Sequence, residues 1–261
     1  MMDRTRRKLD DLKALVRPAS SLPARPRAAT RASLAEVIGG AEARCADLAY
    51  WLLETTFDAA CDPHAVDPLR LATPLVYRFS PARATVVDPR RTVVVDIETG
   101  GFAGTPVFLV GLVLLDQRPL RVRQLLARDY PEEEAILRAL AETAAERDTW
   151  VTFNGKSFDE PFLRDRATLH RVPLTPPRTH VDLLLAARRA WRGRVPNFKL
   201  GTLEQHILRR ERIGDVPSCD VPDLFHHFIR TGNAAPLRPV IQHNQIDLVS
   251  ATELLLRLSG P

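Results

Sequence analysis

The chain has 261 residues, of which 45% are hydrophobic and 26% are charged, and its formal net charge at pH 7 is +5. This balance is typical of a soluble globular protein and excludes a wholly disordered chain. The longest apolar run, Val107 to Leu115, has the length of one strand and is too short to cross a membrane. The first residues lack a secretory signal, and the cysteines are too few for a disulfide framework or a cysteine zinc site: Cys45, Cys61 and Cys219. We therefore expect a cytoplasmic protein with free thiols and no membrane partner.

The positive charge is concentrated at the start of the chain. Residues 1–31 contain nine Lys or Arg and three Asp, a net charge of +6, which leaves −1 for residues 32–261. Pro18, Pro23 and Pro26 prevent a continuous helix through this basic leader. Such an arm can bind a polyanion through salt-sensitive phosphate contacts, or it can be a solvated tail that keeps the protein soluble. The composition alone leaves both interpretations open.

The next segment, residues 32–90, has only a weak pattern. Residues 41–53 favour a helix, and Asp62, Pro63, Pro68 and Pro74 then mark loops. No function can be inferred from this segment.

A clear alternation of strands and helices begins at Thr92. β-Branched and apolar runs predict three strands, and Pro131 followed by three glutamates predicts the start of a helix. The predicted elements are strands over Thr92–Ile97, Val107–Leu115 and Leu120–Leu126, a helix from Pro131, a strand over Trp150–Phe153, a helix over Phe158–His170, and mainly helices over Val181–Leu258. A three-strand antiparallel meander followed by parallel strands predicts an α/β fold, with a mixed sheet flanked by helices.

Carboxylates at the end of the first of these strands form a candidate metal site. Asp96 and Glu98 are two residues apart, so both project from the same face of the strand. Two neighbouring carboxylates repel each other unless a cation lies between them, and hard divalent ions such as Mg²⁺ and Mn²⁺ bind oxygen ligands. An isolated pair also occurs where a strand simply ends in solvent.

Two further groups are compatible with the same chemistry. Asp159 follows an Asn154-Gly155 turn at the junction between a strand and a helix, where α/β sheets gather ligands, although an ordinary helix cap is an alternative. His243 and Asp247 are four residues apart, so a helix places both on one face. An exposed hydrogen-bonded pair is the alternative for these two residues.

Together these three segments resemble the exonuclease motifs of the DEDD superfamily, nucleases with a ribonuclease H-like fold. The matching segments are Asp96-Ile-Glu98, Asn154-Gly-Lys-Ser-Phe-Asp159 and His243-Asn-Gln-Ile-Asp247. The chain is also similar to the bacterial YprB-like family in four further segments: Thr99-Gly-Gly, Phe108-Leu-Val-Gly-Leu, Asn197-Phe-Lys-Leu-Gly-Thr-Leu-Glu204 and Gly214-Asp-Val-Pro. The resemblance covers residues 91–258, whereas the region before residue 91 matches the family poorly.

The resemblance implies a site and a reaction. Asp96, Glu98, Asp159 and Asp247 would hold two Mg²⁺ or Mn²⁺ ions, with His243 as general base. The implied reaction is hydrolysis of phosphodiester bonds in single-stranded DNA or RNA from a 3′ end. The best-known enzymes with this histidine place it five residues before the last aspartate, whereas here the spacing is four.

Further residues are expected to contact the substrate. Asn154 and Lys156 would lie near its phosphate, and Lys199 is another expected phosphate contact. Phe102 or Phe198 could stack on a base, although single aromatic residues more often fill cores. Asp182 and the remaining histidines are interpreted as structural or surface residues.

The alternative function is a catalytically weak module of the same fold that only binds nucleic acid or serves as a scaffold. A missing carboxylate would favour it, and all four are present. A P-loop and a GxSxG nucleophile elbow are both absent from the sequence. The sequence leaves open whether the substrate is DNA or RNA and whether cleavage occurs at ends or at internal sites. It also leaves the oligomeric state open.

Overall fold

The computed structural model describes residues 33–56, 71, 73–80, 83–117 and 119–260. The chain divides into two units, Met1–Arg31 and Ala32–Pro261, and all described residues belong to the second unit. The predicted basic leader, Cys61 and the loops predicted around residues 62–68 therefore lie outside the described residues.

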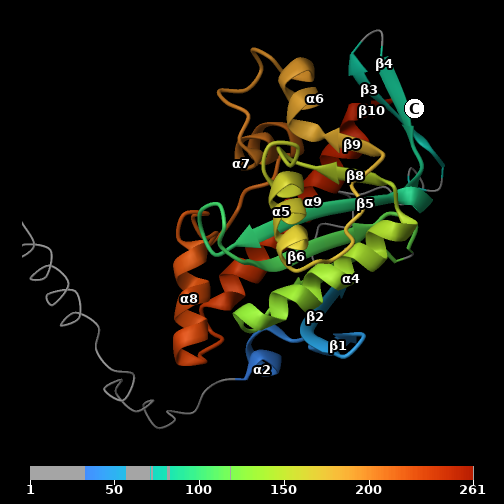
Figure 1. The fold of residues 1–261 in the computed structure, drawn as a ribbon. Helices are drawn as coiled ribbons and strands as arrows, with labels where there is room; N and C mark the ends of the chain where they lie inside the picture. The colour runs from blue at the N-terminus through green and yellow to red at the C-terminus, as the bar shows by residue number, and fades with distance from the viewer. Residues whose placement is uncertain (1–32, 57–70, 72, 81–82, 118, 261) are drawn as a thin grey trace, which may run out of the picture. The chain divides into compact units, whose positions relative to one another are not determined.

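A seven-stranded mixed sheet forms the centre of the second unit (Figure 1). Antiparallel pairing joins β1 to β2, β2 to β7, β7 to β6 and β6 to β5, and parallel pairing joins β5 to β8 and β8 to β9. The predicted meander of three antiparallel strands continued by parallel strands is therefore confirmed. The strands are β1 (Ala41–Cys45), β2 (Leu48–Thr56), β5 (Thr92–Thr99), β6 (Val107–Leu114), β7 (Arg121–Leu126), β8 (Thr149–Thr152) and β9 (Thr179–Asp182).

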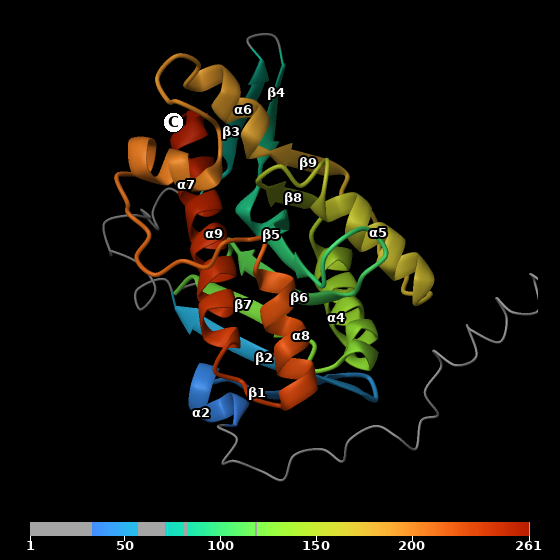
Figure 2. The same cartoon turned by 90° about the vertical axis from the view of Figure 1, so that its left-hand side faces the viewer.

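Helices cover both faces of this sheet. In two perpendicular views, α4 (Glu133–Glu146) and α5 (Asp159–Leu169) lie on one face, and α9 (Leu237–Leu258) crosses the other (Figures 1 and 2). α6 (Leu183–Ala190) packs beside α9, and α8 (Val221–Thr231) contacts both α9 and β5. None of the helices in the described part of the chain is both long and apolar enough to cross a lipid bilayer.

Two buried clusters explain why β5 is so rich in β-branched residues. Val93, Val95 and Ile97 belong to the cluster shared with α4, and Val94 belongs to the cluster shared with α6 and the second half of α9. Since strand side chains alternate, Asp96 and Glu98 project from the same face as Val94. The pattern of burial therefore directs both carboxylates toward the side of the sheet that α9 covers.

Smaller elements complete the unit. A second sheet has the strand order β10-β3-β4, and β3 packs through Leu75 and Tyr77 into the cluster shared with α9. The smaller elements are α2 (Leu34–Ile38), β3 (Leu75–Ser80), β4 (Arg83–Val87), the 3₁₀ turns Pro89–Arg91 and Tyr130–Glu132, α7 (Leu200–Leu203), the π turn Glu204–Leu208, and β10 (Ser259–Gly260).

The predicted helix over residues 41–53 is wrong. These residues form β1 and most of β2, an antiparallel hairpin at the edge of the sheet, in which Cys45 pairs with Leu48. Ala46 has a positive φ of 50°, which lets the chain reverse direction between the two strands. Tyr50 and Leu53 are both buried in the cluster that includes residues of α4 and of the first turns of α9, so tertiary packing outweighs the helix propensity of the alanines and leucines.

Candidate active site

All five predicted catalytic residues line one pocket of about 610 Å³: Asp96, Glu98, Asp159, His243 and Asp247. Asp96 and Glu98 come from the end of β5, Asp159 is the first residue of α5, and the other two lie on α9. Figure 2 looks onto this end of β5, with α9 and α5 on either side and α8 below. Residues that are far apart in the sequence therefore meet at the carboxyl end of β5, and the carboxyl ends of parallel strands are the usual place for ligand sites in α/β sheets.

The turn between β8 and α5 has a conformation that its sequence specifies. Asn154 has a positive φ of 66°, and a Cβ at Gly155 would lie 2.4 Å from the hydroxyl oxygen of Thr152. The buried carboxylate of Asp182 accepts hydrogen bonds from the backbone N–H groups of Asn154 and Lys156, at 3.0 and 3.2 Å. Asp182 also caps α6, so its interpretation as a structural residue fits these contacts.

The carboxylates of the pocket strongly perturb one another. Burial raises the pKa of Asp96 well above its ordinary value, and repulsion from Asp247, Asp159 and Glu98 adds to this effect. Burial and the charges of Asp247 and Asp159 likewise raise the pKa of Glu98 well above its ordinary value. Burial raises the pKa of Asp159 to about 7, even though two backbone N–H groups oppose the shift. In the absence of metal ions, burial and mutual repulsion therefore disfavour the ionised forms of these carboxylates.

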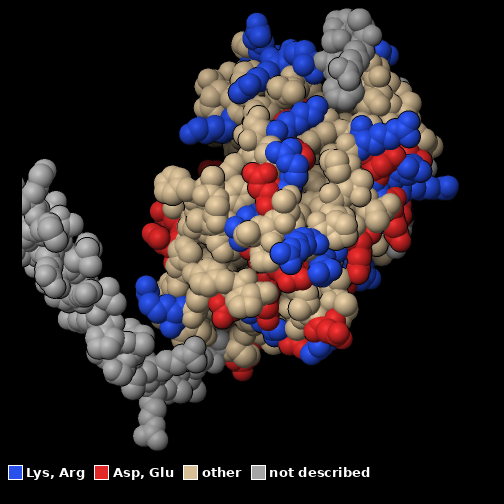
Figure 3. Space-filling model, viewed as in Figure 1, with Lys and Arg blue, Asp and Glu red and all other residues tan. Residues whose placement is uncertain are grey.

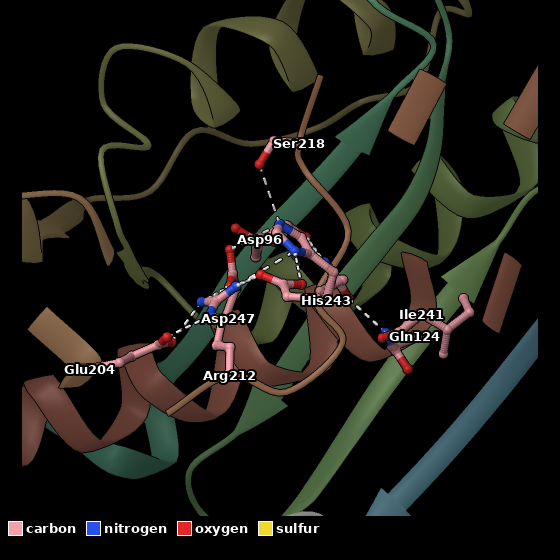
Figure 4. A network of polar contacts seen from close by, with 10 residues as sticks. Asp96, Gln124, Glu204, Arg212, Ser218, Ile241, His243 and Asp247 are labelled. Carbon is pink, nitrogen blue, oxygen red and sulfur yellow. Dashed lines mark hydrogen bonds and ion pairs between the residues drawn. The ribbon is translucent and has the colours of Figure 1, made fainter. Parts of the chain in front are cut away.

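Asp96 is held by a buried chain of two amides. The side-chain NH₂ of Gln124 donates to the carbonyl of Ile241 and to Oδ1 of Asn244, both at 2.8 Å. Because a carbonyl can only accept, the orientation of the Gln124 amide is fixed, and Asn244 must then turn its own NH₂ toward Asp96. Asn244 Nδ2 donates to Asp96 Oδ2 at 2.8 Å (Figure 4 labels Gln124, Ile241 and Asp96). This hydrogen bond favours the ionised form of Asp96 and opposes part of the rise in its pKa.

Gly111 provides the space for this amide chain. It lies on β6, paired with Asp96 on one side and with Gln124 on the other. A Cβ at this position would be 2.3 Å from Oδ1 of Asn244 and 2.6 Å from a methyl carbon of Leu248. Only glycine therefore allows α9 to bring Asn244 over the sheet and against Asp96.

We expect Gly111→Ala to destabilise the protein by about 1–3 kcal/mol, because the added methyl group must displace Asn244 or the backbone of α9. Urea unfolding monitored by circular dichroism measures the effect. Gly201→Ala is the matched control, since a Cβ there would meet no atom closer than 3.9 Å. Equal stability of Gly111→Ala and the wild type would contradict the close approach.

A buried arginine connects the pocket to the neighbouring loop. The guanidinium of Arg212 forms a two-point ion pair with the fully buried Glu204, and it also contacts Asp247 and Asp215 (Figure 4). Burial alone would lower the pKa of Arg212, but the hydrogen bond to Glu204 and the nearby carboxylates raise it. The guanidinium thus stays charged and offsets part of the negative charge of Asp247.

His243 is oriented by a second carboxylate. Its Nδ1 lies 2.6 Å from Oδ1 of Asp215, and its Nε2 lies 3.5 Å from the hydroxyl of Ser218 and 3.8 Å from Oδ2 of Asp247. Although burial opposes the shift, hydrogen bonds from His243 and Arg212 hold the pKa of Asp215 below its ordinary value. An ionised Asp215 accepts a hydrogen bond from the N–H group at Nδ1, which leaves Nε2 as the basic nitrogen when the ring is neutral.

The predicted substrate residues lie at different places. Asn154 lines the active-site pocket and a second pocket beside it, and Lys199 lines the second pocket. Lys156 does not line either of these pockets; its charge lies near His180, where it helps burial to lower the pKa of that histidine to about 4. The structure therefore brings Asn154 and Lys199, but not Lys156, into the hollow around the carboxylates.

Exposed aromatic rings lie at the pocket. Phe102 is 90% exposed and Phe158 is 45% exposed, and both line the pocket. Phe198 instead packs partly buried against the cluster on the α9 face. Of the two phenylalanines considered for base stacking, Phe102 has the exposure that stacking requires, and Phe198 has a packing role.

The oxygen donors of the pocket are suited to hard divalent cations. Within the described residues, no three His, Cys, Asp or Glu side chains are already arranged as a metal-binding cluster. Nevertheless Asp96, Glu98 and Asp159 have raised pKa values, and among the described residues none of the three forms an ion pair with a basic side chain, whereas Asp247 pairs with Arg212. Such carboxylates are the ligands that Mg²⁺ and Mn²⁺ prefer, so the residues present fit these ions.

Several residues of this site were not singled out from the sequence. Arg212 and Gln124 lie outside the motifs of the sequence, and Asn244 lies inside the His243–Asp247 motif without a spacing that indicates its role; their partners lie on other elements of the fold. Asp215 and Glu204 do fall in segments that resemble the YprB-like family, and this was the one signal in the sequence that pointed to them.

Comparisons with known proteins agree with this fold. A family model described as "RNase_H superfamily" matches residues 93–259. YprB of Bacillus subtilis (strain 168), described as an uncharacterized protein, is 34% identical over 169 residues, which are 63% of this chain and 41% of that protein. The chain therefore spans less than half the length of this relative.

Among solved structures, the family B DNA polymerase from the hyperthermophilic archaeon Pyrobaculum calidifontis is similar to this chain. The match covers 64% of this chain and 24% of the polymerase, with a TM-score of 0.53 and 18% sequence identity. At this identity the likeness concerns the fold.

Proposed function

The chain belongs to the RNase H superfamily, and from this premise we propose that it is a metal-dependent nuclease. In this proposal it hydrolyses phosphodiester bonds of single-stranded DNA or RNA, as a 3′–5′ exonuclease. The observation that carries the proposal is that Asp96, Glu98, Asp159, His243 and Asp247 line one pocket. Their mutual repulsion is the electrostatic property that divalent cations would relieve.

Asp96, Glu98, Asp159 and Asp247 would hold two Mg²⁺ or Mn²⁺ ions. Bound there, such ions supply Lewis acidity to a water and to the leaving oxygen of the phosphodiester. The chain contributes the positions of the carboxylates: β5 fixes two of them, and the amide chain through Asn244 prevents Asp96 from rotating.

His243 would act as the general base. Asp215 holds Nδ1, so the free electron pair of the neutral ring is at Nε2, beside Asp247 and Ser218. Nε2 would take the proton of the attacking water, and the resulting imidazolium would be stabilised by Asp215.

Asn154, Lys156 and Lys199 would contact phosphates of the substrate, and Phe102 would stack on a base at the reacting end. The positions of Asn154 and Lys199 on the pocket walls and the exposure of Phe102 support these roles. Lys156, on the exposed side of the turn, could only reach a phosphate outside the pocket.

One observation favours the second candidate function, a module that binds nucleic acid without cleaving it. Arg212 already forms an ion pair with Asp247, and this contact competes with a metal ion for the same carboxylate. The two functions differ in one result, namely whether a product forms when a divalent ion is added.

The test is a cleavage assay on matched DNA and RNA single strands that carry a label at the 5′ end. We expect a ladder of products that shorten from the 3′ end in Mg²⁺ or Mn²⁺ and no products in EDTA. A label at the 3′ end should be released as a mononucleotide. If the wild type gives no product with either metal on either strand, the binding module replaces the nuclease.

A further inference from the structure

A basic segment between α6 and α7 lies beside the active site. The stretch 183–203 contains no acidic residue and five basic ones, all of them exposed: Arg188, Arg189, Arg192, Arg194 and Lys199. Within the described residues, none of the five forms an ion pair with an acidic side chain, whereas most other arginines of the sheet region do. Figure 3 shows Lys and Arg gathered over α6 and the loop that follows it.

This basic segment borders a groove that leads into the active site. The second pocket, of about 750 Å³, is lined by Leu184 of α6 and by Phe198 and Lys199, and it shares Asn154, His243 and Asp247 with the active-site pocket. Arg188 comes one helical turn after Leu184 and therefore extends the same face of α6. The basic segment thus begins on the face of α6 that borders the groove, and it ends at Lys199, which lines the groove.

The fold holds this segment in place. Trp191 is buried in the cluster on the α9 face and anchors its middle. Before α7, the side chain of Asn197 accepts hydrogen bonds from the backbone of Lys199 at 3.0 Å and from the hydroxyl of Thr202 at 2.7 Å. Arg188 and Arg189 lie in the last turn of α6, where positive charge interacts favourably with the helix dipole. Arg192 and Arg194 lie beyond the helix, so the helix dipole does not explain their positive charge.

In the absence of metal ions, the active-site pocket does not attract a polyanion. Its four carboxylates repel phosphate groups, and residues 32–261 together carry a net charge of only −1. Within this unit, affinity for a nucleic acid that does not depend on metal ions therefore needs a local positive surface that is continuous with the pocket.

We propose that the basic segment from Arg188 to Lys199 binds the phosphate backbone of a single nucleic-acid strand, over the nucleotides that precede its reacting end. The placement of that end in the active-site pocket rests on the proposed nuclease function; the binding itself does not. The strand runs from the active-site pocket through the second pocket and along the arginines that follow α6.

Binding of labelled single strands to the full chain in EDTA, followed by fluorescence anisotropy, tests this proposal without cleavage. Strands of about 4 and about 20 nucleotides separate contacts near the pocket from contacts along the segment. The variant Arg188→Gln/Arg192→Gln/Arg194→Gln is compared with Arg90→Gln/Arg171→Gln/Arg230→Gln, three exposed arginines on other elements. Thermal melting confirms that both variants are folded.

We expect the first variant to bind the long strand at least about tenfold more weakly and to lower the slope of log Kd against log salt by about 2, since three phosphate contacts are lost. The short strand and the control variant should change little. A salt slope equal to that of the control would overturn the proposal.

A parallel cleavage assay separates the two proposals. If the altered salt slope is observed but the wild type cleaves no strand, the basic segment binds nucleic acid and the nuclease function fails. If the wild type cleaves but the first variant keeps its affinity and slope, the nuclease stands and the strand takes another path.

Discussion

Replacing Asp96 with asparagine is expected to lower nuclease turnover by on the order of a thousandfold or more, because metal ions at such a site supply several kcal/mol of transition-state stabilisation. Asp96 is repelled by three carboxylates of the pocket, and its replacement would remove a ligand without removing the hydrogen bond donor Asn244. Initial rates on a labelled single strand in Mg²⁺ measure the effect. Asp116→Asn, which changes an exposed carboxylate on the far end of the meander, should cleave like the wild type.

The same variant is expected to melt at a higher temperature than the wild type when both are measured in EDTA. The pKa of Asp96 is raised in the folded chain, so the folded state binds more protons than the unfolded state, and stability falls as the pH rises from about 4 to above the folded pKa. Asparagine carries no charge and removes this loss. The gain in Tm should be larger at pH 8 than at pH 5, at about 2–4 °C for each kcal/mol of repulsion removed.

A lower Tm of Asp96→Asn at pH 8, or a gain that is the same at both pH values, would contradict the electrostatic account. Unfolding of the variant at both pH values would mean that Asp96 is needed for the fold itself. In that case the rate effect would say nothing of catalysis, and Glu98→Gln, on the same strand face, repeats the comparison.

Replacing Arg212 with methionine is expected to destabilise the protein by about 3–5 kcal/mol, which is the usual loss when one partner of a buried ion pair is removed. Glu204 is fully buried, and its carboxylate forms a two-point ion pair with the Arg212 guanidinium. Without Arg212, this buried carboxylate would lose its ion-pair partner, and Asp247 would lose its counter-charge. Chemical unfolding in EDTA measures the loss.

Two comparisons separate the buried charge from the role of Arg212 in the site. Adding Glu204→Gln to Arg212→Met should recover part of the lost stability, since the unpaired charge is then absent. Arg210→Met breaks the ion pair with the buried Glu253, which lies on α9 as Asp247 does. This variant should be less stable than the wild type and have the same turnover. If Arg212→Met is as stable as the wild type, the ion pair between Arg212 and Glu204 does not stabilise the folded protein.

Local pattern identified most of the strands and helices from residue 92 onward. The β-branched run of β5 and the all-apolar run of β6 are buried on both faces, so their composition alone identified them as central strands. Asp96 and Glu98 are the polar interruption of that run, and alternation along a strand was enough to place them on one face. For Asp159 and Asp247, geometry within one element could not show that they face β5, and the resemblance to a nuclease family supplied that link.

What the pattern missed depends on contacts between distant segments. The hairpin of β1 and β2 has a helix-favouring composition, and it is extended because Tyr50 and Leu53 are buried in the core and because β2 pairs with β7. β9 is four residues long and exists because it continues the parallel pairing of β8. Arg212 and Asp215 lie in an irregular loop with no periodicity, so their contacts with α9 could not be inferred from spacing.

Equilibrium titration of the metal-free protein with Mn²⁺, measured by calorimetry in parallel for the wild type and Asp96→Asn, tests most directly whether the clustered carboxylates form a metal site. We expect saturable binding of about two ions per chain to the wild type, and weaker binding or fewer ions with Asp96→Asn, while Asp116→Asn binds like the wild type. Absence of saturable binding, or a binding curve that Asp96→Asn leaves unchanged, would contradict the account.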